Sequence, residues 1–339
     1  MADIAFLTGG TGFVGANLAR LLLEKGWKVR ALARKDSDRR ALAGLPVEVV
    51  EGDLLEPASL AGACRGARHV YHVAADYRIW VPDSQAMMRA NVEGTENVLT
   101  AAGRAGAERI VHCSSVAAVK LREDGGPADE TSEYPGPEGI IGVYKRSKWL
   151  SERAALRLAG EGLPVVVVNP AAPIGPWDVK PTPTGKIVLD FLNRRLPSYV
   201  DTGLNVVHVR DVAEGHWLAA IKGRVGQRYI LGGENLSFKA VLDLLAEETG
   251  LSAPRFKTPY ALAYAVGMLD TARLSVFGGT PVAPLDAVRM ARRKMFFDPA
   301  KAVQELGLPR TPARQALRDA AEWFWANGRA KRPSGVQRP

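Results

Sequence analysis

The 339-residue chain has few cysteines and no long apolar run. Its two cysteines, Cys64 and Cys113, are too few for a disulfide framework, so we expect both to stay reduced. No apolar run approaches the roughly 20 residues of a membrane span, and the first residues lack the pattern of a signal peptide. The sequence therefore predicts a cytoplasmic protein without stable membrane insertion. We also expect no metal site.

Acidic residues are scarcer than basic ones, with 36 Asp and Glu against 45 Lys and Arg, which gives a net charge of +9. The basic residues are spread along the chain without a nucleic-acid-binding motif, so we expect no nucleic-acid partner. Surface charge and a phosphate-bearing cofactor account for the excess. Residues 328–339 contain four basic and no acidic residues. This tail is predicted to be disordered, with weak contact to an anionic membrane surface as an alternative.

Short segments rich in Val, Ile or Ala alternate with helical segments over the first half of the chain. This alternation predicts an α/β fold, a doubly wound parallel (Rossmann) sheet with helices on both faces. The predicted strands are Ile4 to Thr8, Lys28 to Ala33, Val47 to Glu51, His69 to Ala74, Arg109 to Ser114 and Pro164 to Asn169. The predicted helices are Gly15 to Lys25, Ser59 to Cys64, Gln85 to Ala105 and Tyr144 to Gly160.

The pattern changes after Asn169, because residues 170–183 contain five prolines and predict a structured loop. Val206 to Val209 and Arg228 to Gly232 are predicted strands that return to the main lobe. We expect residues 1–169 and 205–232 to form the dinucleotide-binding domain, and residues 170–204 and 233–327 to form a smaller, mainly helical substrate lobe. The helices predicted there are Phe238 to Gly250, Pro259 to Asp270, Pro284 to Arg293 and Pro312 to Asn327.

A glycine-rich turn joins the first strand to the first helix. Gly9, Gly12 and Gly15 follow a GxxGxxG spacing. A dinucleotide site needs glycine here for a tight turn, for close approach of a pyrophosphate and for close packing of helix on strand. The helix N-terminus then stabilises the phosphates. Three glycines can also make a plain turn, but the position between strand and helix favours a nucleotide site.

The end of the second strand indicates which dinucleotide binds. An acidic residue there holds the ribose diol of NAD, whereas arginine suits the 2′-phosphate of NADP. Arg34 and Lys35 occupy this position, so NADP is favoured. Asp36 keeps NAD open, and a solvent-facing role for the two cations is the alternative. Asp53 is placed to meet the adenine amino group, and Ala74 and Ala75 to form a wall of small residues beside the cofactor.

Tyr144 and Lys148 lie four residues apart on a predicted helix, which puts them on one face. A nearby ammonium lowers the pKa of a phenol, and such a tyrosine is an acid for a ketone or a base for an alcohol. Ser114 and Ser115 end the fifth strand and supply a hydroxyl group for the reacting oxygen. Alone, the Tyr–Lys pair could mark only an interfacial helix face.

Together these motifs resemble the extended branch of the short-chain dehydrogenase/reductase superfamily, the NAD-dependent epimerase/dehydratase family, over almost the whole chain. Within it, the chain is most similar to hopanoid-associated sugar epimerases and next to dihydroflavonol reductases. The family motifs are the three glycines, Asp53, residues 72–75 and 91–95, Ser114 and Ser115, Tyr144 with Lys148, and residues 207–213. The closer resemblance rests on residues 72–80, 180–186 and 290–297.

The resemblance implies that Ser115, Tyr144 and Lys148 are catalytic, and that Lys148 contacts the nicotinamide ribose. It also implies a homodimer in which the helices of residues 85–105 and 144–160 pair. The residues predicted to bind the cofactor are Gly9, Thr11, Gly12, Phe13, Val14, Gly15, Arg34, Asp53, Leu54, Ala74, Ala75, Asn91, Tyr144, Lys148, Pro170 and Ile174.

Departures from the family narrow the reaction. Val116 and Ala117 stand where sugar dehydratases carry an Asp-Glu pair, which argues against dehydration. Cys113 is expected to point into the sheet rather than act as a carbon acid–base. Leu204 and Asn205 replace an Arg-Asp pair that helps many epimerases to bind a nucleotide diphosphate. The predicted substrate contacts are Arg78, Trp80, Ser115, Asn169, Trp177 and Lys180.

The sequence thus predicts an enzyme that transfers hydride at a hydroxyl or keto carbon of a small-molecule substrate. A hopanoid-associated sugar epimerase is the first hypothesis, and an NADPH-dependent aldehyde or ketone reductase similar to dihydroflavonol reductases is the alternative. A cofactor-sensing protein without turnover is a distant third, since such a protein has no need of Ser115, Tyr144 and Lys148.

Overall fold

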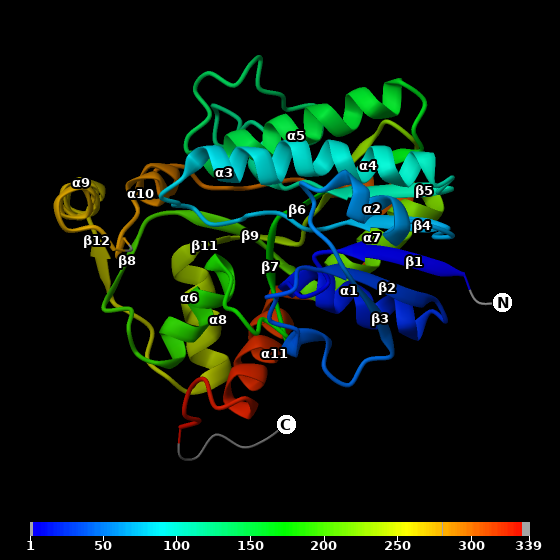
Figure 1. Cartoon of the computed structure of the whole chain (residues 1–339). Coiled ribbons are helices and arrows are strands. Elements are labelled where there is room, and N and C mark those ends of the chain that lie inside the picture. The colour runs from blue at the N-terminus through cyan, green and yellow to red at the C-terminus, as the bar shows by residue number, and fades with distance from the viewer. Residues whose placement is uncertain (1–2, 280, 334–339) are drawn as a thin grey trace.

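A seven-stranded parallel sheet forms the centre of the protein (Figure 1). The computed structural model describes residues 3–279 and 281–333. The strand order is β10-β6-β5-β4-β1-β2-β3, and every neighbouring pair is parallel. The strands are β1 (Ile4–Thr8), β2 (Lys28–Ala33), β3 (Val47–Glu51), β4 (His69–His72), β5 (Arg109–Cys113), β6 (Val165–Pro170) and β10 (Arg228–Leu231). The predicted Rossmann fold is confirmed.

Helices cover both faces of this sheet, because its central strands are apolar on both sides. One core packs α1 (Phe13–Glu24) and α7 (Val209–Lys222) against the sheet. The other packs α2 (Pro57–Ala63), α4 (Gly94–Arg104) and α5 (Val143–Gly160) against the opposite face. The single helix predicted from Gln85 is instead α3 (Ser84–Met88), a π-helical turn (Arg89–Glu93) and α4. Cys64 and Cys113 are free and buried.

A second sheet of three strands lies beside the main one, in the order β11-β9-β7. It contains β7 (Ala172–Ile174), β9 (Gly203–His208) and β11 (Glu234–Ser237). The strand predicted near Val206 therefore pairs within this second sheet, whereas the strand predicted from Arg228 is β10 of the main sheet. Val209 begins helix α7, which the sequence did not predict. The His208 ring caps this helix by accepting a hydrogen bond from the Arg210 amide (3.0 Å).

The C-terminal part is built from helices and short strands. A separate core joins α6 (Pro183–Leu192), α8 (Phe238–Thr249) and α11 (Ala313–Ala326). Outside it lie β8 (Ser198–Val200), β12 (Phe256–Thr258), α9 (Tyr260–Phe277), α10 (Leu285–Ala291) and a π-helical turn (Ala302–Leu306). Over residues 3–279 and 281–333, no helix combines the length and apolar character that a membrane span requires.

The start of the basic tail is ordered, contrary to the prediction of disorder. The Arg329 carbonyl accepts a hydrogen bond from Asn193, and Ala330 is buried in the core around α11. Arg332 forms an ion pair with Glu322 and lies over the Trp325 ring. Residues 334–339 lie outside the described part of the chain.

Candidate active site

Two glycines of the turn after β1, Gly9 and Gly15, have no room for a side chain. Gly9 has φ +73°, and a Cβ there would lie 2.6 Å from the Ala74 backbone nitrogen. A Cβ on Gly15 would lie 2.1 Å from the Gly9 carbonyl oxygen, so α1 packs against the turn. Gly12 caps α1 without a side-chain hydrogen bond, and the first turn of the helix has no acidic residue. The positive end of α1 therefore fits a pyrophosphate.

Of the other turn residues, Thr11 and Val14 are half-buried and Phe13 is buried. Ala74 is fixed beside the turn, because its amide donates a hydrogen bond to the Thr8 hydroxyl (3.2 Å). Ala75 is half-buried in the same segment. These residues lie where the sequence placed the wall of the cofactor site.

Arg34 and Asp36 are exposed just after β2, with 3.9 Å between guanidinium and carboxylate. Either residue can meet an adenosine ribose, so NADP and NAD both fit. Lys180, predicted to contact substrate, lies instead near the β2–β3 connection. There the hydrogen bonds and charge of Arg40, with a smaller contribution from the charge of Lys180, lower the pKa of Asp38 to about 2. Lys180 is thus on the side of Arg34.

Asp53 and Leu54 follow β3. The Asp53 carboxylate accepts a hydrogen bond from the Leu55 amide (2.9 Å), which fixes the turn. The Leu54 side chain packs against Gly94, and its carbonyl accepts a hydrogen bond from Asn97 (2.9 Å). Pro170 ends β6 and Ile174 ends β7, and both residues are buried. Ile174 is part of the C-terminal core. The side chain of Ile174 therefore packs inward.

Asn91 has a different position from the one predicted. Both hydrogens of its amide are donated within the protein, to the Asp76 carbonyl (2.9 Å) and to the Ser147 hydroxyl (2.9 Å). Its oxygen accepts from the Asp76 amide (2.7 Å). Asn91 therefore has no free donor for a cofactor, and it ties the segment after β4 to helix α5, which carries Tyr144.

Ser115 and Tyr144 meet at the carboxyl end of β5. Ser115 caps a short 3₁₀-helix (Val116–Ala118), where its hydroxyl accepts a hydrogen bond from the Ala117 amide (3.1 Å). The same hydroxyl is hydrogen-bonded to the Tyr144 phenol, which comes from the first turn of α5. Lys148, one turn later and buried, donates from Nζ to the Cys113 carbonyl (2.8 Å). The three predicted catalytic residues therefore converge on one strand end.

The pKa of Tyr144 differs in direction from the sequence expectation. Burial raises the pKa of the phenol, and the hydrogen bond from Ser115 only partly offsets this. The Lys148 ammonium donates its hydrogen bond to the Cys113 carbonyl rather than to the phenol. Burial also lowers the pKa of Lys148, with Cys113 and Glu152 opposing the shift. With the protein's own groups alone, Tyr144 is held as a neutral phenol.

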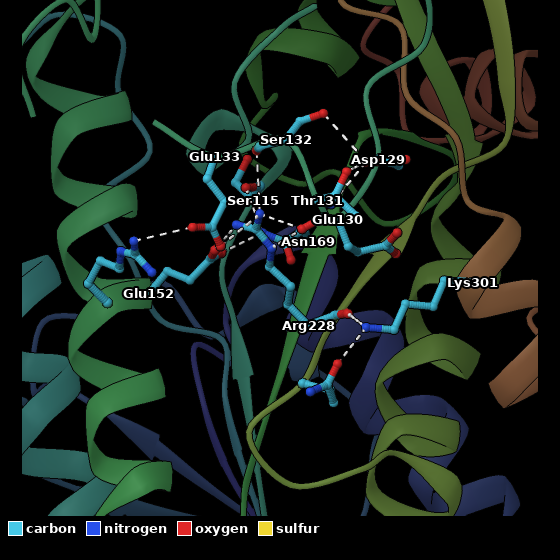
Figure 2. Close-up of polar contacts among 12 residues, drawn as sticks. Ser115, Asp129, Glu130, Thr131, Ser132, Glu133, Glu152, Asn169, Arg228 and Lys301 are labelled. Atoms are coloured by element: carbon cyan, nitrogen blue, oxygen red, sulfur yellow. Dashed lines mark hydrogen bonds and ion pairs between the residues drawn. The ribbon is translucent and has the colours of Figure 1, made fainter. Parts of the chain in front are cut away.

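Behind Ser115 runs a buried polar chain that sequence reasoning missed in part (Figure 2). Asn169 donates from Nδ2 to the Ser115 carbonyl (3.0 Å) and to Glu152 (2.5 Å). Glu152 in turn accepts from Arg228 (2.7 Å), whose guanidinium also donates to the Glu130 carbonyl (2.6 Å). Asn169, predicted to bind substrate, is fully buried behind the site. One signal for Glu152 was its place four residues after Lys148, on the same helix face.

The remaining predicted substrate residues have other contacts or partial exposure in the structure. Arg78 is exposed and paired with Asp76 (2.5 Å), and Trp80 is half-buried. Trp177, with φ +72°, packs under the Arg20 guanidinium, which lies 3.6 Å from its ring centroid, and beside Trp323. Trp177 therefore joins α1 to α11, and its predicted role in substrate binding gains no support from this position.

The geometry of the glycine turn and of the Ser115–Tyr144 pair agrees with a family-level comparison. The model of the NAD dependent epimerase/dehydratase family matches residues 5–232. The chain belongs to this family. Members of the NAD dependent epimerase/dehydratase family are NAD(P)-dependent enzymes of the extended short-chain dehydrogenase/reductase type, and so is this protein.

Relatives within the family cover nearly the whole chain. A Synechocystis sp. protein named "Putative dihydroflavonol 4-reductase" is 48% identical over 98% of this chain and 97% of its own. Sterol demethylase protein B of Methylococcus capsulatus is 38% identical over 95% of this chain and 98% of its own.

Solved structures of the same shape include the crystal structure of gox2253, with TM-score 0.87 and 46% identity over 97% of this chain and all of that one. A nucleoside-diphosphate-sugar epimerase from Pseudomonas aeruginosa has TM-score 0.82 and 28% identity, over 98% of this chain and all of that one.

Proposed function

We propose that this protein is an NAD(P)-dependent reductase that converts a carbonyl group into a hydroxyl group, as the dihydroflavonol-reductase-like hypothesis predicts. The observation that carries the proposal is the pair of hydroxyl groups of Ser115 and Tyr144 at the carboxyl end of β5, beside buried Lys148. Relatives named for a dihydroflavonol reductase and a sterol demethylase component support a reductase better than the hopanoid-associated sugar epimerase predicted first.

The protein's own groups suit reduction. Because burial raises the pKa of Tyr144 above its ordinary value of about 10, the phenol is protonated at neutral pH. Its Oη can donate that proton to a carbonyl oxygen, while the Ser115 hydroxyl donates a hydrogen bond to the same oxygen. A bound nicotinamide supplies the hydride. The buried chain behind Ser115 holds the serine backbone in place.

Two further features argue against other reactions of the family. Val116 and Ala117 form the 3₁₀-helix after Ser115, so this position holds no carboxylate for dehydration. Asn205 is buried, and its amide is hydrogen-bonded to Gly233, Asn235 and Phe297. The first feature argues against dehydration, and the second favours a substrate without a nucleotide diphosphate.

A sugar epimerase is the second candidate, because the family includes nucleotide-sugar epimerases and the P. aeruginosa structure carries that title. For the cofactor we propose NADP, on the position of Arg34, with NAD as the alternative. We also propose a homodimer formed through α4 and α5, as the family resemblance implies.

A cofactor-oxidation screen tests the function. Purified protein is mixed with NADPH or NADH and with a panel of ketones, aldehydes and activated sugars, and absorbance at the nicotinamide band is followed. A reductase consumes reduced cofactor in step with alcohol formed. An inverted sugar hydroxyl without net cofactor change would favour the epimerase, as would dinucleotide retained through purification and detected by mass spectrometry. Cofactor binding without turnover of any compound would favour a sensing protein.

A further inference from the structure

Helix α9 turns large apolar side chains outward. Its 18 residues contain one acidic and one basic residue. Exposed fractions reach 72% at Leu269, 73% at Val276 and 81% at Phe277. We call these and their exposed neighbours the apolar face. It comprises Phe256, Leu262, Val266, Met268, Leu269, Val276, Phe277 and Val282.

The inner side of α9 uses small or polar residues, the reverse of an ordinary surface helix. Gly267 packs against Leu285 and Val288 of α10, where a Cβ would lie 3.3 Å from each side chain. Asp270 is buried and accepts hydrogen bonds from the Val282 and Ala283 amides (2.6 and 2.8 Å). The acid of the helix is therefore used internally, and the outward face remains apolar. Exposed apolar patches of this kind mark interaction sites.

Basic residues lie within and near the apolar face; Arg273 shares a side of α9 with Leu269 and Val276. Residues 256–294 contain six Lys or Arg and two Asp. The cations are Lys257, Arg273, Arg289, Arg292, Arg293 and Lys294, and all six are exposed. An apolar face with cations within and near it is complementary to an anionic bilayer surface, where apolar side chains enter the headgroup region and cations meet lipid headgroups.

We propose that the apolar face of α9 docks on the surface of an anionic lipid bilayer. A second copy of this chain is a poorer occupant, because two-fold pairing would bring the same six cations against themselves. Docking here is interfacial, since the described helices include none that could span a bilayer. Figure 1 shows α9 at one end of the molecule, with α10 between it and α3, so the face is free to approach a plane.

Helix α10, which packs against α9, also contacts the segment that leads into α5. The Asp286 carboxylate of α10 lies against Gly142, where a Cβ would be 3.2 Å from its oxygen. Gly142 directly precedes α5, which carries Tyr144 in its first turn. A cleft of about 680 Å³ between α3, the segment before α5, and α10 includes Ile140, Ile141 and Arg289. If the proposed reductase function holds, bilayer docking would bring a membrane-dissolved, lipophilic carbonyl compound to this cleft.

Vesicle flotation tests the docking without reference to turnover. The full chain is mixed with phosphatidylcholine vesicles, with or without phosphatidylserine, and the fraction that floats is measured. We expect at least about tenfold more binding to the phosphatidylserine vesicles. The double variant Leu269→Glu/Phe277→Glu should lose this binding about tenfold or more, since it places carboxylates on the apolar face. Ile221→Glu/Val225→Glu is the matched control, because those side chains are 47% and 43% exposed on another surface.

Three results would overturn the proposal. The first is equal flotation of the wild type and the Leu269→Glu/Phe277→Glu variant, or no flotation of either. The second is loss of flotation only on deletion of residues 334–339, which would assign binding to the tail. The third is a wild-type dimer that this variant converts to a monomer, which would assign the face to a second copy. NADPH binding and reduction of a water-soluble carbonyl, measured without vesicles, should be equal in all variants, so failure of the reductase proposal is seen separately.

Discussion

At the scale of single residues, Tyr144 is set apart by its partner and by its protonation state. The phenol is hydrogen-bonded to Ser115, and burial raises its pKa. A neutral phenol is the acid that reduction of a carbonyl needs. The direction of this shift is opposite to the one expected from the Tyr–Lys spacing, and it agrees with the reduction proposed above.

Replacing Tyr144 by Phe should remove the proton donor while keeping the ring. We expect kcat/KM for carbonyl reduction to fall by about 10² to 10⁴, with the dissociation constant of NADPH unchanged in a fluorescence titration. Tyr134→Phe, which alters a phenol outside the site, is the control. Unchanged turnover of the Tyr144→Phe protein would refute the assigned role.

Asp178 predicts a pH dependence of stability. It is buried and accepts hydrogen bonds from Thr182, and burial raises its pKa from 3.8 to about 6. A carboxyl whose folded pKa is raised contributes stability below its unfolded pKa, and that contribution is lost as pH rises through the folded value. Relative to Asp178→Asn, the wild type should therefore lose about 1–3 kcal/mol of unfolding free energy between pH 4 and pH 8. Urea unfolding at several pH values checks this, and a pH-independent difference between the two proteins would contradict it.

At the scale of elements, the site depends on how α1 and α5 are held against the sheet. α1 approaches the turn after β1 as closely as glycine allows, and α5 is joined to β6 and β10 through the chain of Glu152, Asn169 and Arg228. Both contacts place helix starts at the carboxyl edge of the sheet, where this fold class binds its ligands.

Gly15 and Gly62 offer a matched pair of helical glycines. A Cβ on Gly15 would overlap the Gly9 carbonyl, whereas nothing lies within 4 Å of a Cβ on Gly62. Gly15→Ala should lower the unfolding free energy by about 1–3 kcal/mol or more and weaken dinucleotide binding. Gly62→Ala should be neutral or stabilise by up to about 1 kcal/mol. Thermal unfolding and isothermal titration with NADPH measure both effects, and similar behaviour of the two variants would count against the close packing of α1.

Replacing one partner of the Glu152–Arg228 pair should greatly lower the free energy of unfolding. Both side chains are almost fully buried, whereas the other carboxylate near the guanidinium, that of Glu133 at 3.5 Å, is exposed. Glu152→Gln therefore removes the buried counter-charge of Arg228 and should cost about 3–5 kcal/mol. Glu152→Gln/Arg228→Met should recover part of that loss. Breaking the exposed Arg68–Asp3 pair with Asp3→Asn should lower the unfolding free energy far less, because water screens both charges. Urea unfolding of the four proteins decides, and equal effects of Glu152→Gln and Asp3→Asn would show that the buried pair is not special.

At the scale of the whole molecule, a dinucleotide that binds only the folded chain raises its stability by mass action. At 100 times the dissociation constant the gain is about 2.7 kcal/mol. The preferred dinucleotide therefore reveals itself in the melting temperature, without a known substrate.

If Arg34 selects the 2′-phosphate, NADP at equal concentration should raise Tm more than NAD does, and Arg34→Ala should remove the difference. Arg104→Ala, another exposed cation at the end of α4, should leave it intact. Differential scanning fluorimetry measures Tm for the wild type and the two variants with each of the two dinucleotides, which gives six values. An equal or larger effect of NAD on the wild type would show that Asp36, not Arg34, governs the choice.

The sequence by itself determined the parallel sheet and the glycine turn, and it predicted the group of Ser115, Tyr144 and Lys148. Short β-branched runs, glycines three apart and a Tyr–Lys pair four apart are local patterns, and backbone geometry fixes what they form. Only the tertiary structure decided that β9 joins a second sheet, that the Asn91 amide makes its hydrogen bonds within the protein, and that burial governs the pKa of Tyr144. The sequence could not show the series of hydrogen bonds behind Ser115 for the same reason. Asn169 lies 54 residues from Ser115, and Arg228 lies 76 residues from Glu152. Only the packing of β6, β10 and α5 brings these side chains together.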